Sequence, residues 1–399
     1  MEWRPRKKPK EVRIAFIGTG IQQRVHAINY QKIPGVKFVA ACDIIEEKLN
    51  EFCDDFNIEH RYVDYREMLK RDDIDAVDIT VHNNLHLPLV VEVLRSGKHC
   101  YCEKPMAGSF ADALTMYKAS EDYGKMLHIQ LARIYDPATV AAKEYIDKGK
   151  LGKIYHARSY GYRRRGRPYV DGYGEKEFTQ SKMAQHGALY DMGVYHISQL
   201  LYLLGLPKLE RVTGKVYQEL DMDPVRKEIS KFDVEELGVG FAYYENGLTL
   251  DIIESWAIHG GPFPSSAIYG SKGGISLGSG YGSIKENPMD NAFTFYDEEL
   301  GYPRVIKLDL YAEFSRRAQV DPSYSFYADS QSHWIAALRG ECQLLPTKDI
   351  ALETMRVSEG IFLSSTLGRE IYADEIPTLS KSTALRTQET PFGTLKYDF

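Results

Sequence analysis

Two patterns of apolar residues alternate along the first third of the chain. Short, nearly continuous apolar runs predict buried strands, and amphipathic stretches between them predict helices. The strand-like runs span residues 12–20, 36–43, 74–81, 99–105 and 126–132. The helix-like stretches cover residues 22–32, 86–97 and 111–124. Strands that alternate with helices in this way predict an α/β fold with a right-handed, doubly wound parallel sheet.

The pattern changes after a helix predicted at residues 137–153. Apolar and polar residues then alternate over 211–220 and 234–258, where Asn246-Gly247 fits a hairpin turn. We expect an antiparallel sheet with one face against helices and the other against a partner subunit. Two further helices are predicted at residues 323–339 and 347–367. The last residues lack periodicity, so they either wrap a neighbouring subunit or are disordered.

Length and composition narrow the class of protein. A chain of 399 residues is too long for one ordinary core, so two domains are expected. The formal charge of −6 argues against nucleic acid as a partner, and no run approaches the roughly 18 apolar residues of a membrane span. The basic residues 4–10 predict a solvated tail. Five cysteines without metal-site or redox spacing suggest a reducing, cytoplasmic compartment.

A glycine turn follows the first predicted strand. Gly18 permits a tight turn, and Gly20 lets the backbone approach a pyrophosphate at the start of the next helix, where Ile21 and Gln22 lie. Asp43 ends the second strand, where a carboxylate holds ribose hydroxyls and disfavours a 2′-phosphate. The cofactor expected is therefore NAD rather than NADP. Gln23 occupies the third glycine position, so a glycine-rich turn in an unrelated α/β protein is the alternative.

Polar residues follow two later strands of the same predicted sheet. Lys104, preceded by Glu103, ends one strand, and the loop with Asn83 and His86 follows another. Ligands bind at this carboxyl edge, so all four residues are expected to contact the cofactor. The alternative for Lys104 is a surface salt bridge with Glu103.

Several segments together resemble one enzyme family. They are "GTGIQQRVH", "AACD", "HNNLH", "LRSGKHCYCEKPM" and "HGALYDMGVYH". The chain resembles the glucose-fructose oxidoreductase and inositol dehydrogenase (Gfo/Idh/MocA) family over about residues 11–375. The resemblance implies a Rossmann NAD-binding domain (11–135) and an α/β domain for substrate binding and oligomerisation with a large, open, mostly antiparallel sheet (136–375). Residues 376–399 are expected to form a C-terminal tail.

The resemblance also implies catalytic roles. The family's Glu-Lys-Pro lysine lies beside the nicotinamide and the substrate hydroxyl, and it corresponds to Lys104. Asp191 is expected to bind substrate hydroxyls or fix the base. Many inositol dehydrogenase relatives carry histidine four residues after this aspartate; here that position is Tyr195, and His196 follows. The general base is therefore either Tyr195 or His196. His196 is preferred because its ordinary pKa of about 6.5 suits proton transfer. The alternative interpretation is that His196 packs in the core.

Other residues are candidate substrate contacts. Arginines in the basic run 162–169 could hold a sugar by stacking and paired hydrogen bonds, although charge runs are usually solvated. His82 and His186 differ from many relatives and are candidates for substrate tuning. Trp256 and His259 either form a sugar platform or, for Trp256, pack in the core. The candidate substrate contacts are Arg163, Arg164, Arg165, His186, Asp191 and His196.

Three functions follow from these expectations. The leading one is NAD-dependent oxidation or reduction of a secondary ring hydroxyl in a sugar, cyclic polyol or glycoside, such as C3 of a glucoside. The second is a glycosidase or lyase that uses transient oxidation, with a base such as His186. The third is an NAD-binding sensor without catalysis. No metal is expected, because no cluster has ligand spacing. The expected partners are a small substrate and further copies of the chain.

Overall fold

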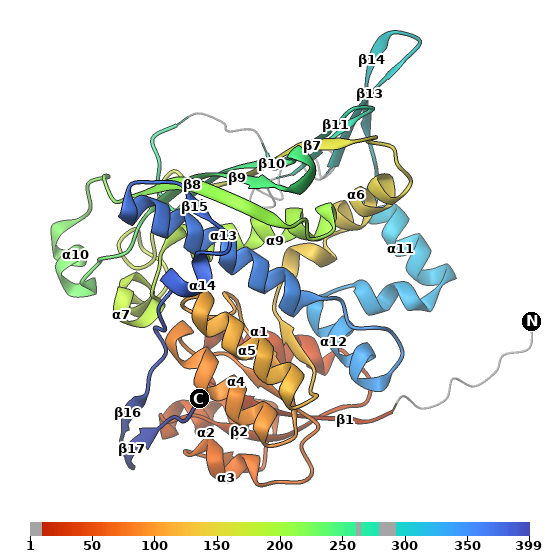
Figure 1. The fold of residues 1–399 in the computed structure, drawn as a ribbon. Coiled ribbons are helices and arrows are strands. Elements are labelled where there is room, and N and C mark those ends of the chain that lie inside the picture. Colours follow the sequence, from red (N-terminus) through yellow and green to blue (C-terminus); the bar gives the residue numbers. More distant parts are fainter. Residues whose placement is uncertain (1–9, 261–264, 279–292) are drawn as a thin grey trace, which may run out of the picture.

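The computed structural model describes residues 10–260, 265–278 and 293–399. Its described part is built on two sheets with helices between and beside them (Figure 1). The predicted solvated tail at residues 4–10 lies almost entirely outside the described residues. No helix in the described ranges is long and apolar enough to cross a membrane.

The first sheet has six parallel strands in the order β3-β2-β1-β4-β5-β6. The strands are β1 Val12–Ile17, β2 Val36–Cys42, β3 His60–Tyr62, β4 Ala76–Ile79, β5 His99–Cys102 and β6 Leu127–Ile129. The helices between them are α1 Ile21–Gln31, α2 Glu46–Phe56, α3 Tyr65–Leu69, α4 His86–Arg95 and α5 Phe110–Asp122. The predicted doubly wound sheet is confirmed. Elements α2, β3 and α3 are not among those predicted from the sequence.

The second sheet has nine strands in the order β14-β13-β12-β11-β7-β10-β9-β8-β15. They are β7 Ile154–Tyr162, β8 Leu209–Tyr217, β9 Leu237–Tyr244, β10 Thr249–Ser255, β11 Ala267–Gly270, β12 Gly274–Leu277, β13 Phe293–Glu299, β14 Tyr302–Lys307 and β15 Ile371–Tyr372. Among the described strand pairs of this second sheet, only β7 and β10 are parallel. The expectation of a large, mostly antiparallel sheet is therefore confirmed.

Helices cover one face of the second sheet. Helix α9 (Gly193–Leu204) packs on β7, and α13 (Thr347–Leu367) packs on β8 (Figure 1). The burial of β9 alternates along its length, and its outward residues are only partly covered within the described chain. The remaining helices are α6 Pro137–Asp147, α7 Ser181–Ala184, α8 Ala188–Asp191, α10 Pro224–Ser230, α11 Leu310–Val320 and α14 Ile376–Leu379.

Helix α12 (Ser330–Arg339) returns to the first sheet from late in the chain. Trp334 and Ile335 are fully buried in a cluster with residues of β1, α1 and α2. The hydroxyl of Ser330 lies 2.9 Å from the Tyr101 hydroxyl and 2.8 Å from Nε2 of His128. The predicted helix at 323–339 begins late, because residues 322–327 form a 3-10 turn and Asp329 caps α12.

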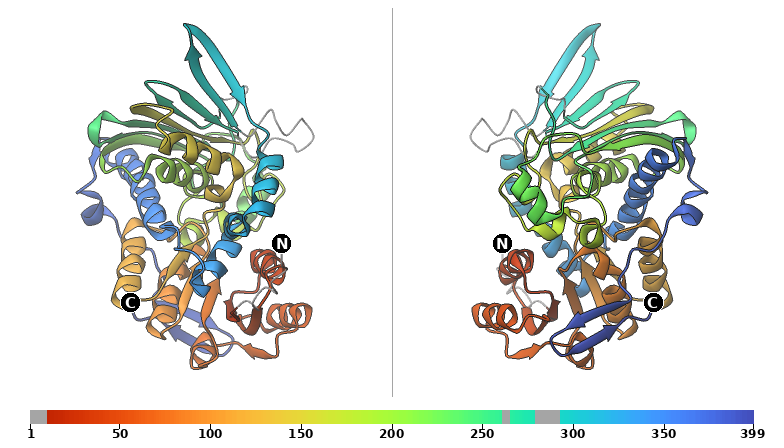
Figure 2. Two further views of the ribbon diagram at one scale, coloured as in Figure 1. Left: turned by 90° about the vertical axis from the view of Figure 1, so that its right-hand side faces the viewer. Right: turned by 90° about the vertical axis from the view of Figure 1, so that its left-hand side faces the viewer.

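The C-terminal residues form a hairpin of β16 (Thr387–Thr390) and β17 (Gly393–Lys396). It lies beside the first sheet of its own chain (Figure 2). Leu395 and Tyr397 are 2% and 4% exposed, and their burial holds the hairpin there. The expectation that these residues are disordered or wrap a neighbouring subunit therefore differs from the structure.

Candidate active site

The glycine turn has room for a ligand only at one of its glycines. Gly18 has φ +87°, and a Cβ there would lie 2.2 Å from the Thr80 carbonyl oxygen. At Gly20, which precedes α1, a Cβ would have nothing within 4 Å, and no side chain caps the helix. The start of α1 therefore has open space beside Gly20, which pyrophosphate binding at a helix N-terminus requires.

Gln23 fills the position of the third glycine. Its side chain is fully buried, and its oxygen accepts a hydrogen bond of 2.9 Å from the Thr80 hydroxyl. A side chain therefore joins α1 to the end of β4, where a glycine would allow direct packing. The incomplete glycine pattern is compatible with the βαβ geometry.

Asp43 is fixed at the end of β2 by the glycine turn. One carboxylate oxygen accepts hydrogen bonds from the Thr19 backbone (2.8 Å) and hydroxyl (2.9 Å), and the other accepts one from the Ile45 backbone (2.9 Å). A fixed carboxylate suits ribose hydroxyls and repels a 2′-phosphate. Thr19 is not among the residues predicted from the sequence, although its place between two glycines is a visible signal.

A cavity of about 500 Å³ runs along this edge of the sheet. Every residue predicted to contact the cofactor lines it except His86; the lining ones are Gly18, Gly20, Ile21, Gln22, Asp43, Asn83, Glu103 and Lys104. His86 is instead buried beneath the edge, with its ring nitrogens 2.9 Å from the Pro105 oxygen and 3.2 Å from the Val81 oxygen. The open backbone at Gly20, the fixed Asp43 and the cavity together fit NAD.

Lys104 lies at one end of this cavity and pairs across the domains. Its Nζ is 2.7 Å from Oδ1 of Asp191 and 4.7 Å from the centre of the Tyr195 ring. The Glu103 carboxylate accepts the Lys104 backbone N–H at 2.9 Å. The alternative of a surface salt bridge with Glu103 is therefore wrong: the ammonium meets Asp191, and its side chain is only 16% exposed. The Lys104–Pro105 peptide bond is cis.

These three groups set one another's protonation. Burial alone would lower the pKa of Lys104, but neighbouring charges, Asp191 foremost, raise it well above its ordinary value. Burial opposes ionisation of Asp191, yet Lys104 and the Trp256 indole keep its pKa below the ordinary value. Burial raises the pKa of Tyr195, and Lys104 opposes that rise. The resting site thus holds an ammonium, a carboxylate and a neutral phenol.

Asp191 is positioned from two directions. Glu235 accepts hydrogen bonds from the backbones of Gly187 (2.7 Å) and Leu189 (2.9 Å), which fixes the start of α8. Burial raises the pKa of Glu235 to about 7. The indole of Trp256 donates to Oδ2 of Asp191 at 2.9 Å. Trp256 is 2% exposed, so it supports the site from the core.

His196 pairs with a carboxylate outside this group and does not line the cavity. It is 3% exposed, and its Nδ1 lies 2.9 Å from Glu254, which also accepts a hydrogen bond from Ser159. A Cβ on Gly161 would lie 2.3 Å from the His196 ring, so the histidine packs against β7. One residue along a helix rotates a side chain by about 100°, which separates His196 from the face of Asp191 and Tyr195. The preference for His196 over Tyr195 as the base does not fit this placement.

A buried histidine supports the Glu-Lys-Pro turn from behind. His26 of α1 lies 3.0 Å from Asp78 and 2.9 Å from Glu103, and Gln22 donates to the same Glu103 oxygen at 3.0 Å. Burial, the largest single influence, lowers the pKa of His26, but the two carboxylates together raise it to about 10. His26 and Asp78 are not among the residues predicted from the sequence. The signal for them is a histidine on the buried face of α1.

The basic run lies in a loop beside the second sheet. Arg163 donates to the Gly166 carbonyl, and its charge helps to lower the pKa of Asp191. Arg164 and Arg165 are exposed, and Arg165 lies 3.9 Å from Asp171. Of the three predicted arginine contacts, only Arg163 is thereby linked to the site.

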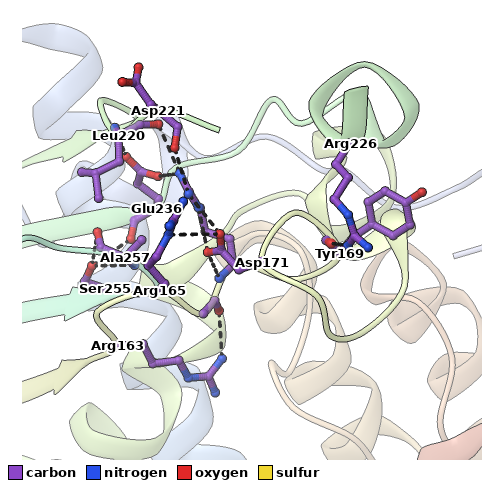
Figure 3. A network of polar contacts seen from close by, with 12 residues as sticks. Arg163, Arg165, Tyr169, Asp171, Leu220, Asp221, Arg226, Glu236, Ser255 and Ala257 are labelled. Atoms are coloured by element: carbon purple, nitrogen blue, oxygen red, sulfur yellow. Dashed lines mark hydrogen bonds and ion pairs between the residues drawn. The ribbon is translucent and has the colours of Figure 1, made fainter. Parts of the chain in front are cut away.

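Arg167, which sequence analysis did not single out, is 1% exposed and organises this loop. It pairs with Asp171 and Glu236, both at 2.9 Å, and donates to the carbonyls of Leu220 and Asp221. Figure 3 shows Asp171, Glu236 and the two carbonyls converging between the loop and the sheet. The basic run 162–169, whose charges are expected to be solvated, therefore contains one buried arginine.

The remaining histidines lie in different surroundings. The His186 ring stacks on that of Tyr190 (4.1 Å between centres) and is tilted against that of Phe362 (4.0 Å), and burial lowers its pKa to about 3. His82 lines the cavity, edge-on to Phe178. His259 is exposed. Among the described residues, no group of three or more histidine, cysteine or acidic side chains could hold a metal ion.

Comparison with protein families matches two models. Residues 12–131 match the oxidoreductase family model with an NAD-binding Rossmann fold, and residues 139–276 match the GFO/IDH/MocA C-terminal domain. The Escherichia coli (strain K12) D-glucoside 3-dehydrogenase is 26% identical over 62% of this chain and 71% of its own length. The Salmonella typhimurium inositol 2-dehydrogenase is 35% identical over 32% of this chain but only 39% of its own length.

Solved structures share the fold. A levoglucosan dehydrogenase in complex with NADH superposes with a TM-score of 0.73 at 18% identity, over 91% of this chain and 99% of the other. The aldose-aldose oxidoreductase of Caulobacter crescentus gives 0.70 at 20% identity, over 91% and 100%. At these identities the likeness extends to the architecture alone.

Proposed function

This chain belongs to the Gfo/Idh/MocA oxidoreductase family, and we propose that it oxidises a secondary ring hydroxyl of a sugar, glycoside or cyclic polyol with NAD. The observation that carries the proposal is the meeting of Lys104, Asp191 and Tyr195, where Lys104 and Tyr195 line one end of the nucleotide cavity. The similarity to D-glucoside 3-dehydrogenase favours a glucoside oxidised at C3.

The residues divide the chemistry among them. When bound, NAD supplies the hydride acceptor. The Lys104 ammonium stabilises negative charge on the substrate oxygen as its proton leaves. Asp191, held by Lys104 and Trp256, accepts a hydrogen bond from a second hydroxyl of the ring and so fixes its orientation.

Tyr195 is the proton-transfer group in this proposal. It shares a cavity end with Lys104, whereas His196 is bonded to Glu254 on the buried side of α9. The pKa of Tyr195 is raised above its ordinary 10, so the phenol stays protonated at neutral pH. We therefore expect the oxidation rate to keep rising with pH from 7 to 9.5. A histidine base would give a plateau above its pKa of about 6.5.

Two other functions compete with this one. The glycosidase or lyase reaction needs a base beside the oxidised carbon, and the apolar surroundings and pKa of about 3 make His186 a poor one. A non-catalytic NAD sensor would not need the ion pair of Lys104 and Asp191, which is mostly buried.

We also propose a cytoplasmic homo-oligomer. Its interface is the uncovered face of the nine-stranded sheet, where the half-exposed rings of Phe241 and Tyr269 flank His156. In this proposal residues 11–135 serve the cofactor and 136–375 the substrate and the interface. The cysteine spacing that suggests a reducing compartment supports the location.

The deciding experiment incubates the protein with NAD and a panel of free sugars, inositols and glucosides, and identifies every product by mass spectrometry. A product two hydrogens lighter, with its aglycone intact, is expected. Release of the aglycone would show that the reaction is a cleavage and would contradict the assignment as a dehydrogenase. NAD binding without any product would favour the non-catalytic sensor.

Variants at the site test the roles of its residues. Lys104→Met should lower kcat by about 10³-fold or more, with NAD affinity within a few-fold. Tyr195→Phe should lower kcat by about 10²-fold and abolish the rise with pH. Tyr202→Phe, two turns along α9, is the matched control and should be neutral. Normal turnover in Lys104→Met would contradict the assignment.

A further inference from the structure

The C-terminal hairpin supplies a wall of the nucleotide cavity. Gln388, Leu395 and Tyr397 line this cavity together with Asp43, although more than 340 residues separate them from it. Exposure alternates at the end of the chain, since Leu395 and Tyr397 are buried and Lys396 is exposed. One side of the hairpin thus faces the cavity and the other faces solvent.

The hairpin meets the cavity near the ends of β2 and β3. The Tyr397 ring stacks on that of Tyr65 with 6.2 Å between centres and 13° between planes. The groups that shift the pKa of Tyr397 after burial are Cys42, Arg66 and Asp64. These residues surround the ends of β2 and β3, where Asp43 is placed to hold the ribose of the adenosine half.

Contacts on both sides of the hairpin hold it in place. The backbone and hydroxyl of Thr383 donate to Asp112 at 2.8 and 2.9 Å, and the Leu385 backbone donates to the Asn84 carbonyl at 2.9 Å. Beyond β17, Arg95 donates to the carbonyl of Asp398 at 2.9 Å. The wall is therefore formed before a ligand binds, which lowers the entropy cost of binding.

We propose that this hairpin forms part of the binding site for the adenine of NAD. The stacked rings of Tyr65 and Tyr397, with Leu395, give the flat apolar wall that a purine base packs against. The Tyr397 hydroxyl donates to the side-chain oxygen of Gln388 at 2.6 Å and so orients that amide at the cavity. The inference rests on the proposed use of NAD and assigns its adenine recognition to the last residues of the chain.

Binding of the two halves of the cofactor tests the proposal. Calorimetry measures the affinity of the full-length protein for NAD, ADP-ribose and nicotinamide mononucleotide. Tyr397→Leu keeps apolar bulk but removes the ring, so ADP-ribose and NAD should bind about tenfold more weakly. Nicotinamide mononucleotide should change less than about twofold. Lys396→Ala, on the outer side of β17, is the matched control and should bind all three normally.

The outcomes separate this inference from the proposed function. Unchanged ADP-ribose affinity in Tyr397→Leu, or an equal loss for both halves, overturns the adenine assignment and leaves NAD-dependent oxidation intact. Failure of the unaltered protein to bind either NAD or ADP-ribose overturns both. If Tyr397→Leu does not fold, Gln388→Ala replaces it, with an expected loss for ADP-ribose of about threefold and the same controls.

Discussion

Two buried ion networks support the Lys104–Asp191 pair from opposite sides, and they differ in the cation at their centre. On the nucleotide side, His26 joins Asp78 to Glu103, which accepts the backbone N–H of Lys104. On the substrate side, Arg167 joins Asp171 to Glu236. The backbone carbonyl of Glu236 accepts the N–H of Trp256, whose indole donates to Asp191.

The difference concerns what each network does when the pH changes. A guanidinium stays charged at every pH that a folded protein experiences, so the substrate-side network is permanent. An imidazolium can lose its proton, so the nucleotide-side network depends on the two carboxylates that raise the pKa of His26 to about 10. The Lys104–Asp191 pair is therefore supported by one network whose central cation titrates and by one whose central cation does not.

Removing the permanent cation should have the largest effect on stability. Arg167→Met leaves Asp171 and Glu236 without their guanidinium partner. Breaking a buried ion pair in this way lowers the free energy of unfolding by about 3–5 kcal/mol. Urea unfolding at neutral pH measures the loss. Arg165→Met is the control, since that side chain is 72% exposed and its removal should change stability by less than about 0.5 kcal/mol. A small loss in Arg167→Met would mean that the network does not hold the loop.

The titrating network predicts a pH dependence of smaller size. Below pH 6.5 the folded and unfolded chains both carry a protonated His26, so its stabilisation is complete. Between 6.5 and about 10 only the folded chain keeps that proton, so the free energy of unfolding should fall by up to about 1.4 kcal/mol for each pH unit. Urea unfolding from pH 6 to 10.5 measures the slope. His26→Gln should be flatter over this range, and an identical slope would contradict the raised pKa.

The smallest expected effect is confined to the nucleotide side. Thr19→Val removes the hydroxyl donor to Asp43 and keeps the backbone donor. NAD should bind about fivefold more weakly, corresponding to the loss of about 1 kcal/mol for one hydrogen bond. Calorimetry with NAD measures this change, and the KM for the sugar serves as the control. A rise in the sugar KM of the same size would show that the two sides are coupled.

Residues fixed by local geometry were predictable from sequence. Gly18, Gly20 and Asp43 follow from the order of strand, turn and helix, and Lys104 follows from its place at a strand end. Helical spacing also placed Asp191 and Tyr195 on one face. These predictions need only the order and periodicity of elements that are neighbours along the chain.

Residues fixed by distant partners were not predictable. His196 was preferred for its ordinary pKa, but Glu254, 58 residues later, holds it on the buried side of α9. Arg167 pairs with Glu236, and Tyr397 stacks on Tyr65, so their partners likewise come from distant segments. A pattern along the chain carries no information on such pairings, because it describes one element at a time.

Helix α12 has a consequence for how the protein is made. The cluster that contains Trp334 and Ile335 also contains Phe16 and Phe52, so the first sheet cannot complete its core until that helix has been synthesised. About 200 residues separate the end of that sheet from α12, which corresponds to roughly 10–40 s of translation. During that interval the nascent first domain leaves an apolar surface uncovered on the ribosome.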